Sequence, residues 1–367
     1  MPYMDNNFGN PGSLHVLGRS AKAAVDRARE QVAEFMGADS PEQIIFTSGG
    51  SEGNNMVMLG VDGYMFWASK QKILVSQIEH DSILNTEEHL PYGVEMVFAK
   101  PKQNGIVTAR EVEWSMGKLH DIGLVSVMSA NNELGTLNPV SEICEVAHRF
   151  GALFHTDAVQ AAGLYPLEVS KNEYDYVTIS SHKIHGPKGV GALYVRDRRD
   201  IHSLIWGGSH QEFGLRGGTE NVAGIVGFGK ACELMSTGYE ERRKHLDDLN
   251  DTLFASLARN FHKHQIDPKL FHINGSSPWD AKTINLRFDG VDAQTLLLML
   301  DSQGICVSAG SACTAHEDTP SHVLKAIGLT DEEARSSIRI SFSGMNTVTE
   351  VEQAAQIIAD CVKALRS

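Results

Sequence analysis

Short apolar segments alternate with helical segments along the first part of the chain. The apolar segments have the length and composition of β-strands, and they are QIIFT, KILVS, VEMVFA, LVSVM, ALFHT, YVTIS and GALYV. Helical stretches such as SEICEVAHRFG separate several of them. Parallel strands need a crossover connection, and a helix usually supplies it. The alternation therefore predicts an α/β fold built on a mostly parallel sheet.

The pattern changes after NVAGIVGFGKACELM, a segment with the composition of a helix. GYEERRKHLDDLNDTLFASLARN follows and is typical of a long, charged amphipathic helix. Beyond it lie the expected strands KTINLRFDG and SSIRISFS and the expected helix DAQTLLLMLDSQG. A chain of 367 residues exceeds what one core usually holds. We therefore expect a large domain over residues 1–238 and a smaller α+β domain over 239–367.

The stretch GIVGFGKA fits the G-x-x-x-x-G-K pattern of a phosphate-binding P-loop. In that motif the next residue is Ser or Thr, whose hydroxyl binds magnesium, but here it is Ala231. The stretch also follows no predicted strand. We interpret its glycines as helix-packing residues.

The chain is acidic, with 46 aspartates and glutamates against 32 lysines and arginines and a formal net charge of −14. This charge repels nucleic-acid backbones and anionic lipid, so neither is expected as the main partner.

The five cysteines are odd in number and form no C-x-x-C pair, which indicates reduced thiols. The N-terminus lacks the pattern of a signal peptide, and no apolar run is long enough to cross a bilayer. We expect a cytoplasmic protein.

In open α/β sheets, ligands bind beyond the carboxyl ends of the strands. The polar residues that follow each strand are therefore candidates for a site. QIIFT is followed by SGGSE, residues 48–52. Glycines let the backbone approach an anion, and the next helix directs free N–H groups toward it. These residues alone favour an ordinary Gly/Ser helix cap, and a phosphate-binding turn is the alternative.

Asp157 follows ALFHT, and Lys183 follows YVTIS closely. A carboxylate at a buried strand end can bind a cation, a metal or a protonated ring nitrogen, or it can cap a helix. A lysine so close to an apolar strand is expected to be partly desolvated and nucleophilic, with a surface lysine as the alternative. His182 and His185 have no third ligand at a supporting spacing, so no metal site is expected. The carboxylate, the lysine and the turn after QIIFT together match the needs of pyridoxal phosphate.

One cysteine lies in a polar stretch, SAGSACTAHEDTPSHVL. Cysteine is usually buried, and packing explains Cys144, Cys232 and Cys361 in their apolar helical segments. We extend that interpretation to Cys306. It does not suit Cys313, whose neighbours are small, hydroxyl-bearing and acidic. We infer a loop whose thiol takes part in chemistry.

The motifs FTSGGSEGNN, IEHDSI, NNELG, HTDAVQ, SSHKIHGPKG, RGGTEN and GSACT occur here in the order of one known family. From FGNPGSLH to SSIRISF, nearly the whole chain resembles the cysteine desulfurases of the NifS/IscS type. These are pyridoxal-phosphate enzymes of the class V aminotransferase group with fold type I. The resemblance implies a mostly parallel seven-stranded sheet in the large domain and a small C-terminal domain that carries the cysteine loop. It also implies a homodimer whose sites are shared between subunits.

The resemblance assigns roles to the matching positions. Lys183 would bond to the cofactor as a Schiff base, Asp157 would face the pyridine nitrogen, and His80 would stack on the ring and is a candidate for moving protons. Gln160 would bind the ring hydroxyl, and Asn132 would contact the cofactor or the substrate beside it. The phosphate would be held by Gly50, Ser51, Ser180 and His182, and Thr219 would reach the phosphate of the partner subunit. Arg339 would hold the substrate carboxylate. Taken singly, each residue also has a structural explanation, such as a helix cap for Asn132.

The activity implied by the resemblance is sulfur transfer from L-cysteine. Lys183 would take the Cα proton, and the Cys313 thiolate would attack the substrate sulfur. L-Alanine and a persulfide on Cys313 would result. The polar stretch is similar to the subgroup whose cysteine lies on an extended segment and passes sulfur to an acceptor protein. Acceptors of that subgroup belong to iron–sulfur cluster assembly or thiolation pathways.

The chain departs from the family pattern at its start. Family members usually begin with a segment like YLDNNATTP, which has no counterpart before MPYM, so the resemblance also predicts a shortened N-terminus. Two alternatives remain beside the desulfurase. One is another class V enzyme, such as a selenocysteine lyase or an aminotransferase. The other is an inactive scaffold that binds the cofactor.

Overall fold

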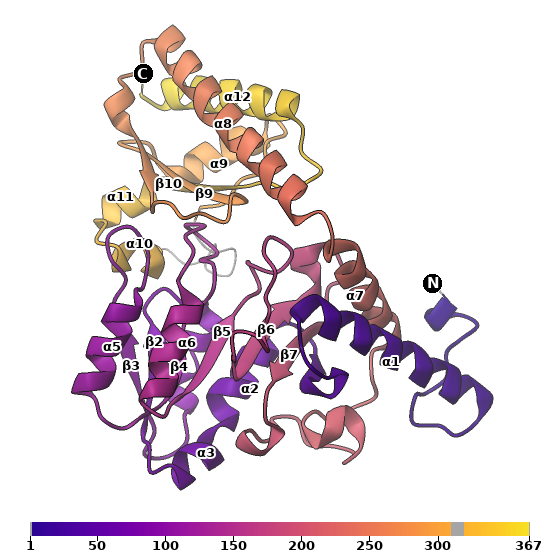
Figure 1. Cartoon of the computed structure of the whole chain (residues 1–367). Helices are drawn as coiled ribbons and strands as arrows, with labels where there is room; N and C mark the ends of the chain where they lie inside the picture. Colours follow the sequence, from indigo (N-terminus) through magenta and orange to yellow (C-terminus); the bar gives the residue numbers. More distant parts are fainter. Residues whose placement is uncertain (1, 310–318, 367) are drawn as a thin grey trace. The chain divides into compact units, whose positions relative to one another are not determined.

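The chain forms two compact units (Figure 1). The structure is a computed structural model and describes residues 2–309 and 319–366. The first unit comprises Met1–Ala99, Val107–Ser129 and Asn138–Tyr239. The second comprises Lys100–Ile106, Ala130–Leu137 and Glu240–Ser367. Two short segments from the first part of the chain therefore belong to the second unit.

A seven-stranded sheet forms the centre of the first unit. Its strands are β1 (Ile44–Thr47), β2 (Lys72–Ser76), β3 (Glu95–Ala99), β4 (Ile122–Ser126), β5 (Leu153–Asp157), β6 (Tyr176–Ser180) and β7 (Gly191–Val195). They lie in the order β1-β7-β6-β5-β4-β2-β3. Strand β7 pairs antiparallel with β1 and β6, and the other neighbouring strands are parallel. The predicted mostly parallel sheet is confirmed, with β4 beginning at Ile122, ahead of the segment LVSVM.

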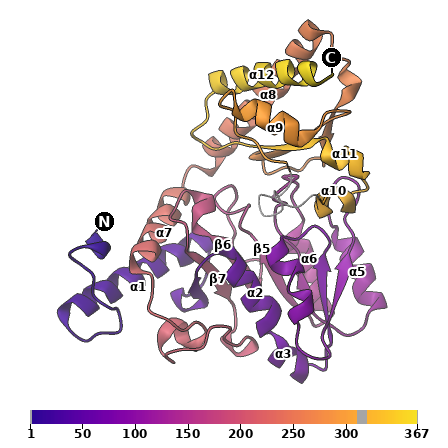
Figure 2. The same ribbon diagram turned by 180° about the vertical axis from the view of Figure 1, so that it is seen from behind.

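Helices cover both faces of this sheet, which Figures 1 and 2 view from opposite sides. One hydrophobic cluster includes side chains of α1 (Val16–Met36), α5 (Ala109–Lys118), α6 (Val140–Arg149) and α7 (Val222–Met235). The other includes side chains of α2 (Gly50–Gly60), α3 (Asp62–Trp67) and α4 (Asp81–Leu84). Ile44 and Phe46 of β1 point into the first cluster, and Ile45 points into the second. Because both faces are covered, β4, β6 and β7 are buried along their whole length instead of alternating between buried and exposed residues.

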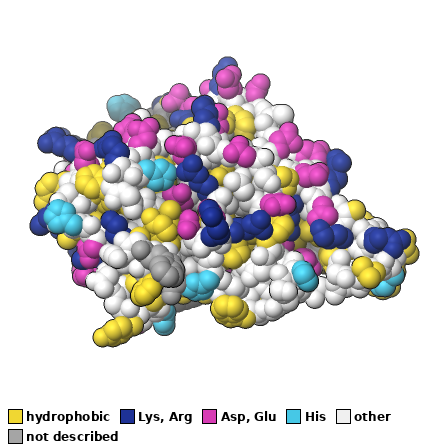
Figure 3. All heavy atoms as spheres, turned by 60° about the horizontal axis from the view of Figure 1, so that its bottom comes forward, with side chains coloured by type: hydrophobic (Ala, Val, Ile, Leu, Met, Phe, Trp, Pro, Cys, Tyr) yellow, Lys and Arg dark blue, Asp and Glu magenta, His cyan; other side chains and the backbone are white. Residues whose placement is uncertain are grey.

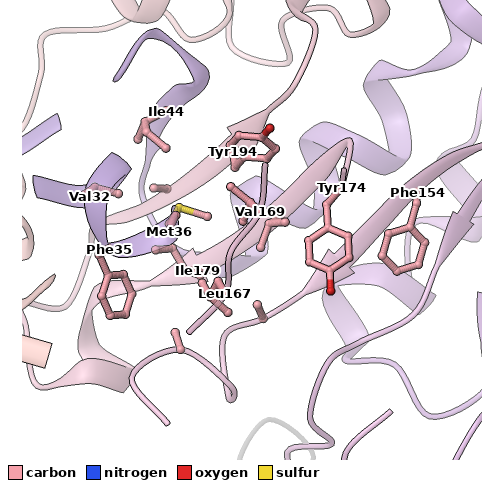
Figure 4. Close-up of a cluster of buried hydrophobic side chains, with 14 of the residues drawn as sticks. Val32, Phe35, Met36, Ile44, Phe154, Leu167, Val169, Tyr174, Ile179 and Tyr194 are labelled. Carbon is pink, nitrogen blue, oxygen red and sulfur yellow. The ribbon is translucent and has the colours of Figure 1, made fainter. Parts of the chain in front are cut away.

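Figure 4 shows part of the first cluster. Val32, Phe35 and Met36 of α1 lie beside strand residues of the sheet, including Ile179 of β6. Each of these four side chains is at most 4% exposed. This packing holds α1 on the sheet, because burial of each such side chain contributes about 1.5–3 kcal/mol.

Helix α7 contains the glycines that resemble a P-loop. A Cβ atom at Gly227 would lie 2.5 Å from Pro187 Cγ, and one at Gly229 would lie 2.7 Å from the Cα atom of Ala28 in α1. Neither position has room for a larger residue, since real Cβ atoms do not approach this closely. The interpretation of these glycines as helix-packing residues is confirmed.

The second unit contains a three-stranded antiparallel sheet in the order β10-β9-β8. Its strands are β8 (Phe271–Asn274), β9 (Thr283–Phe288) and β10 (Ser337–Ser341). Its helices are α8 (Tyr239–His264), α9 (Ala293–Asp301), α10 (His322–Ala326), α11 (Asp331–Arg335) and α12 (Val348–Arg366). The rings of Phe261, Phe271 and Phe288 pack with centroids 5.7–6.1 Å apart and join α8 to the sheet. Neither β8 nor α12 was predicted from the sequence.

Short 3-10 helices connect the main elements. They are η1 (Pro2–Met4), η2 (Pro41–Gln43), η3 (Glu87–His89), η4 (Ser181–Ile184), η5 (Arg198–Asp200), η6 (Gln211–Gly214) and η7 (Pro268–Leu270). One of them, η4, directly follows β6 and carries Lys183. The 3-10 geometry closes a turn in few residues, so it places a side chain close to the strand end.

The cysteines differ in their surroundings. Cys144, Cys232 and Cys361 are buried, as expected for packing residues. The same expectation for Cys306 is wrong, because this thiol is exposed. It lies beyond α9 in irregular backbone, where no strand or helix buries it. Cys313 lies outside the described residues.

The surface carries charges of both signs. On the face drawn in Figure 3, lysine and arginine side chains lie interspersed with aspartate and glutamate side chains. Surface ion pairs include Arg198–Glu42 and Arg149–Glu113, with N···O distances of 3.1 and 2.6 Å. Such exposed pairs contribute little to stability. None of the helices in the described part of the chain combines the length and the apolar character needed to cross a bilayer.

An ion pair near the end of α6 makes stability depend on pH. His148 Nε2 lies 2.8 Å from Asp175 Oδ2. The Asp175 carboxylate raises the pKa of His148 above its ordinary value of 6.5, against the opposing effect of burial. A raised folded pKa means that the pair stabilises the fold fully below the unfolded pKa and loses this contribution as pH rises through the folded pKa.

We therefore expect His148→Gln to lower the free energy of unfolding by about 1 kcal/mol near pH 6 and by much less near pH 9. Urea unfolding followed by circular dichroism at the two pH values measures this difference. His148 is the better partner to replace, because Asp175 also accepts a hydrogen bond from the backbone N of Phe154 at 2.8 Å. An equal loss at both pH values would contradict the prediction.

Candidate active site

Six strands of the first unit direct their carboxyl ends to the same edge of the sheet. Both β1 and β6 run antiparallel to β7, so β1 has the same direction as β2, β3, β4, β5 and β6. The residues that follow these strands include most of the site residues expected in this unit. They are Gly50 and Ser51 after β1, His80 after β2, Asp157 and Gln160 at and after β5, and Ser180, His182 and Lys183 at and after β6.

Asp157 ends β5 and is 6% exposed. Its Oδ2 accepts a hydrogen bond from Asn54 Nδ2 at 2.7 Å, and its Oδ1 accepts one from the backbone N of Val159 at 2.9 Å. Burial raises the pKa of the carboxyl, while these donors and the neighbouring His80 and Lys183 side chains act in the opposite direction. A buried carboxylate is stable only with donors and a cationic partner. A protonated ring nitrogen suits this position.

Lys183 lies in η4, in the turn after β6, and is half-buried. Its charge acts on the Asp157 carboxyl, so the two groups share one electrostatic environment. The turn closes at His185, which has a left-handed φ of 65°. A Cβ atom at Gly186 would lie 2.1 Å from Ser181 Oγ, so the turn is too tight for a larger residue. The prediction of a partly desolvated lysine agrees with this half-buried position.

His80 precedes α4 and caps it. The His80 Nδ1 atom accepts a hydrogen bond from the backbone N of Ser82 at 3.1 Å, and Ser82 Oγ lies 2.9 Å from the same nitrogen. The ring is half-buried, and it lies close enough to Asp157 to influence that carboxyl. His80, Asp157 and Lys183 are therefore grouped at one place on the sheet edge.

The turn after β1 has the features of an anion site. Helix α2 begins at Gly50, and within the described part of the chain no side chain hydrogen-bonds to its first N–H groups as an N-cap. A Cβ atom at Gly50 would lie 3.8 Å from Ser180 Cβ, so this turn adjoins the end of β6. There Ser180 Oγ lies 2.9 Å from His182 Nδ1. Open N–H groups at the start of an eleven-residue helix, with a hydroxyl and an imidazole beside them, suit a phosphate.

Neutral polar groups lie behind this edge. Glu79 Oε1 accepts hydrogen bonds from Ser76 Oγ at 2.6 Å and from the backbone N of Met128 at 2.7 Å, which ties β2 to the end of β4. Burial raises the pKa of Glu79 to about 8, so its carboxyl is largely protonated at neutral pH. His155 lies within hydrogen-bond distance of Ser126 Oγ and Thr178 Oγ1, and burial lowers its pKa to about 3. These groups connect neighbouring strands without adding charge.

Two further predicted residues occupy different surroundings in the first unit. Gln160 is buried after β5. Thr219 is exposed and, with Thr47, Ser48 and Arg216, lines a cavity of about 170 Å³. Arg216 Nε is paired with Glu52 Oε1 at 2.9 Å. Thr219 is thus accessible from outside the unit, as its expected contact with a partner subunit requires.

The second unit holds Arg339 on β10 together with Asn132. Arg339 Nη1 donates to the Asn132 backbone O at 3.0 Å, and Nη2 lies 3.4 Å from Ser308 Oγ. Arg339 Nε and Asn132 Oδ1 are buried and have no hydrogen-bond partner among the described residues. Burial lowers the pKa of Arg339, and Glu133 acts against this effect. A buried guanidinium N–H without an acceptor suits a carboxylate ligand.

Sequence reasoning missed several residues that shape the site. Asn54 donates a hydrogen bond to Asp157, and the backbone N of Ser82 donates one to His80. Glu79, next to His80, accepts a hydrogen bond from the backbone N of Met128. Asn54 and Glu79 lie inside the quoted motifs FTSGGSEGNN and IEHDSI, but their contacts could not be inferred from the motifs. One feature of the sequence could have indicated them: each is a polar residue at a position where the helix or strand pattern predicts a buried side chain.

The chain belongs to the class V aminotransferase family. The family described as "Aminotransferase class-V" matches residues 1–354. The relatives are cysteine desulfurases, as the sequence motifs indicated. "Cysteine desulfurase IscS" of Methanosarcina thermophila is 39% identical over 372 residues, which cover all of this chain and 88% of the relative.

Solved structures agree with this assignment. A "NIFS-LIKE PROTEIN" superposes with a TM-score of 0.86 at 35% identity, covering 98% of this chain and 93% of that one. "SspA in complex with cysteine" gives a TM-score of 0.77 at 34% identity, covering 94% of each chain. The predicted α/β fold and the predicted NifS/IscS resemblance are confirmed. Membership of this family implies pyridoxal phosphate as cofactor.

Proposed function

We propose that this protein takes sulfur from L-cysteine, releases L-alanine and holds the sulfur as a persulfide on Cys313. The grouping of Lys183, Asp157 and His80 at the carboxyl edge of the sheet carries the proposal. It places an amine, a buried carboxylate and an imidazole together in a chain whose relatives are cysteine desulfurases. Each of these groups has a defined task in such a reaction.

The residues of the first unit fit pyridoxal phosphate. Asp157 would face the ring nitrogen, because a buried carboxylate with two N–H donors favours a cationic partner. Gly50, Ser51, Ser180 and His182 would hold the phosphate at the start of α2, and Gln160 would bind the ring hydroxyl. When bound, the cofactor supplies an electron sink that stabilises negative charge at Cα of an amino acid. Lys183 supplies the amine that fastens the cofactor and takes the Cα proton of the substrate.

Arg339 and Asn132 would bind the substrate. The buried Nε of Arg339 has no acceptor among the described residues, and a cysteine carboxylate supplies one. Because Nη1 is already held by the Asn132 backbone, the guanidinium has a defined orientation before the substrate arrives. Orientation of this kind lowers the entropy cost of binding.

Sulfur transfer follows from the chemistry of the thiolate. The Cys313 Sγ atom forms a bond to the substrate sulfur while the substrate Cβ–S bond breaks. The electron pair of that bond remains with the carbon skeleton, which gains protons to become alanine. No external oxidant or reductant takes part. Attack requires the thiolate, since an ordinary thiol has a pKa of about 8.5.

We also propose a homodimer and a protein acceptor for the sulfur. Trp206 is 80% exposed, and its neighbour Ile205 accepts a hydrogen bond from the backbone N of Gly217, close to Thr219. Exposed aromatic residues are enriched at protein interfaces. The identity of the acceptor and a cytoplasmic location stay predictions from the sequence.

The experiment measures alanine and persulfide together. The full chain, loaded with pyridoxal phosphate, is incubated with L-cysteine, and the peptide that contains residue 313 is analysed by mass spectrometry. We expect alanine release and one added sulfur atom on Cys313. Cys313→Ser should lose both, because a hydroxyl is a poor acceptor for sulfur.

Cys306→Ser is the matched control, because Cys306 is the exposed thiol of the described residues. It should keep alanine release and the persulfide on Cys313. Undiminished turnover by Cys313→Ser would favour another class V reaction: alanine as product would indicate a lyase, such as a selenocysteine lyase, and a 2-keto acid would indicate an aminotransferase. Release of neither product by the original chain would refute the desulfurase proposal.

A further inference from the structure

Asn54 connects two parts of the candidate site. It lies in α2 and is 1% exposed. Its Nδ2 donates to Asp157 Oδ2 at 2.7 Å and to Ser82 Oγ at 2.9 Å. An amide nitrogen carries two protons, so both are engaged. The carboxylate of Asp157 can only accept, and this fixes which end of the amide faces it.

The orientation of Asn54 in turn fixes that of Ser82. Ser82 Oγ accepts from Asn54, so its own proton is available for another acceptor. The acceptor within reach is His80 Nδ1, 2.9 Å from Ser82 Oγ. A chain of hydrogen bonds therefore runs from Asp157 through Asn54 and Ser82 to His80. It joins β5, α2 and α4.

The His80 ring receives a second hydrogen bond that defines its protonation. The backbone N of Ser82 donates to Nδ1 at 3.1 Å. A backbone N–H is always a donor, so Nδ1 must be the unprotonated nitrogen of the ring. A neutral imidazole has one proton, and the partner of one nitrogen determines which nitrogen carries it. The proton therefore lies on Nε2.

We propose that Asn54 and Ser82 are positioning residues that link Asp157 to His80 and hold the His80 ring with its proton on Nε2. The ring then presents an N–H donor at its free edge, not a basic lone pair. Lys183 is left as the base, and His80 acts as a donor to the substrate or the cofactor. Only this last assignment rests on the proposed function, because the tautomer itself follows from the hydrogen bonds.

His15 offers an internal reference. Its Nδ1 caps α1 by accepting a hydrogen bond from the backbone N of Gly18 at 3.2 Å, as His80 caps α4. Both rings thus accept a capping bond from a backbone N–H. Only the His80 ring also lies within hydrogen-bond distance of the Ser82 hydroxyl, which Asn54 orients. Comparison of the two rings separates the effect of the cap from that of Asn54 and Ser82.

The test observes the ring nitrogens directly. The full chain is labelled with ¹⁵N in its 16 histidines, with and without pyridoxal phosphate, and the tautomers are read from long-range ¹H–¹⁵N spectra. His80→Gln identifies the His80 signals. We expect the Nε2–H tautomer alone in the original chain. In Ser82→Ala and Asn54→Leu the capping bond from the backbone N of residue 82 keeps this tautomer, but the Nδ1 signal should move toward that of His15, which accepts a backbone capping bond without a serine hydroxyl.

Kinetics supply the second measurement. We expect Ser82→Ala and Asn54→Leu to lower kcat for L-cysteine about tenfold, with a smaller change in KM, because proton transfer is affected more than binding. Ser82→Thr keeps the hydroxyl and should restore both the spectrum and kcat. Asn55→Ala is the matched control. It removes the 2.6 Å bond from Asn55 Nδ2 to Ser82 O, which also joins α2 to α4, and should leave the His80 spectrum unchanged.

A proton on Nδ1 of His80 in the original chain would overturn the proposal. So would spectra of Ser82→Ala and Asn54→Leu that match the original, even if kcat falls, because the two residues would then act only on folding. The original-chain spectrum needs no variant to fold. Failure of the proposed function gives a different result, in which the tautomer is as expected but no alanine forms.

Discussion

Lys183→Ala should lower the turnover of L-cysteine by a factor of about 10³ or more. The substitution removes the amine that bonds covalently to the cofactor and that acts as the base for the Cα proton. A positioned general base alone increases a reaction rate by about 10²–10⁴-fold. Lys183 lies directly after β6, in a tight turn at the carboxyl end of that strand. Alanine release is the first measurement. Borohydride reduction followed by peptide mass spectrometry is the second, and it should find pyridoxal bonded to Lys183 in the original chain and to no lysine in the variant.

Lys188→Ala is the matched control for this substitution. Lys188 lies in the same segment, SSHKIHGPKG, but is exposed, so it should keep turnover and the labelled Lys183. Labelling of another lysine in the original chain, or turnover that survives in Lys183→Ala, would remove Lys183 from the proposed mechanism.

Asp157→Asn should lower kcat by a factor of about 10² or more and weaken the binding of pyridoxal phosphate. The substitution keeps the size of the side chain but removes the negative charge that the ring nitrogen requires. Loss of one preorganised electrostatic partner in a buried site commonly costs about 10²–10³-fold in rate. Asp157 accepts from Asn54 Nδ2 and from the Val159 backbone N with different oxygens, and asparagine would place an NH2 group, which is a donor, against one of these two donors. Kinetics and cofactor titration by absorbance measure the two effects.

Asp121→Asn serves as the control for Asp157→Asn. Asp121 pairs with Lys72 at 2.7 Å beside the start of β2, at the opposite edge of the sheet. It should change neither cofactor affinity nor kcat. Urea unfolding without cofactor separates a loss of stability from a loss of chemistry. Full activity of Asp157→Asn would show that the cofactor does not depend on this carboxylate.

The location of Lys183 and Asp157 could be predicted because a parallel sheet brings the carboxyl ends of its strands to one edge. Each residue lies at or just beyond an apolar segment with a strand pattern, so strand order along the chain was enough to place both on that edge. The exact bounds of the strands were less important, since β4 began earlier than expected without changing the arrangement. The resemblance of the motifs to one family then indicated the reaction that these residues carry out.

Predictions that required packing were less successful. Cys306 was expected to be buried, but it is exposed, because an apolar neighbourhood in sequence does not guarantee a neighbouring element in space. Strand β8 was missed because its segment FHIN is short and only partly buried, which leaves a weak apolar pattern. Gly227 and Gly229 were interpreted correctly, since the missing hydroxyl residue excluded the alternative motif.

The sequence by itself determined the fold class, the family and the chemical types present at the sheet edge. These follow from periodicity and from local motifs, which depend on a few neighbouring residues. Only the tertiary structure decided that Asn54 of α2 joins Asp157 to Ser82, and that Asn132 lies against Arg339 on β10. Such contacts join residues far apart in the chain and require donor and acceptor to meet within about 3 Å, which no local pattern specifies.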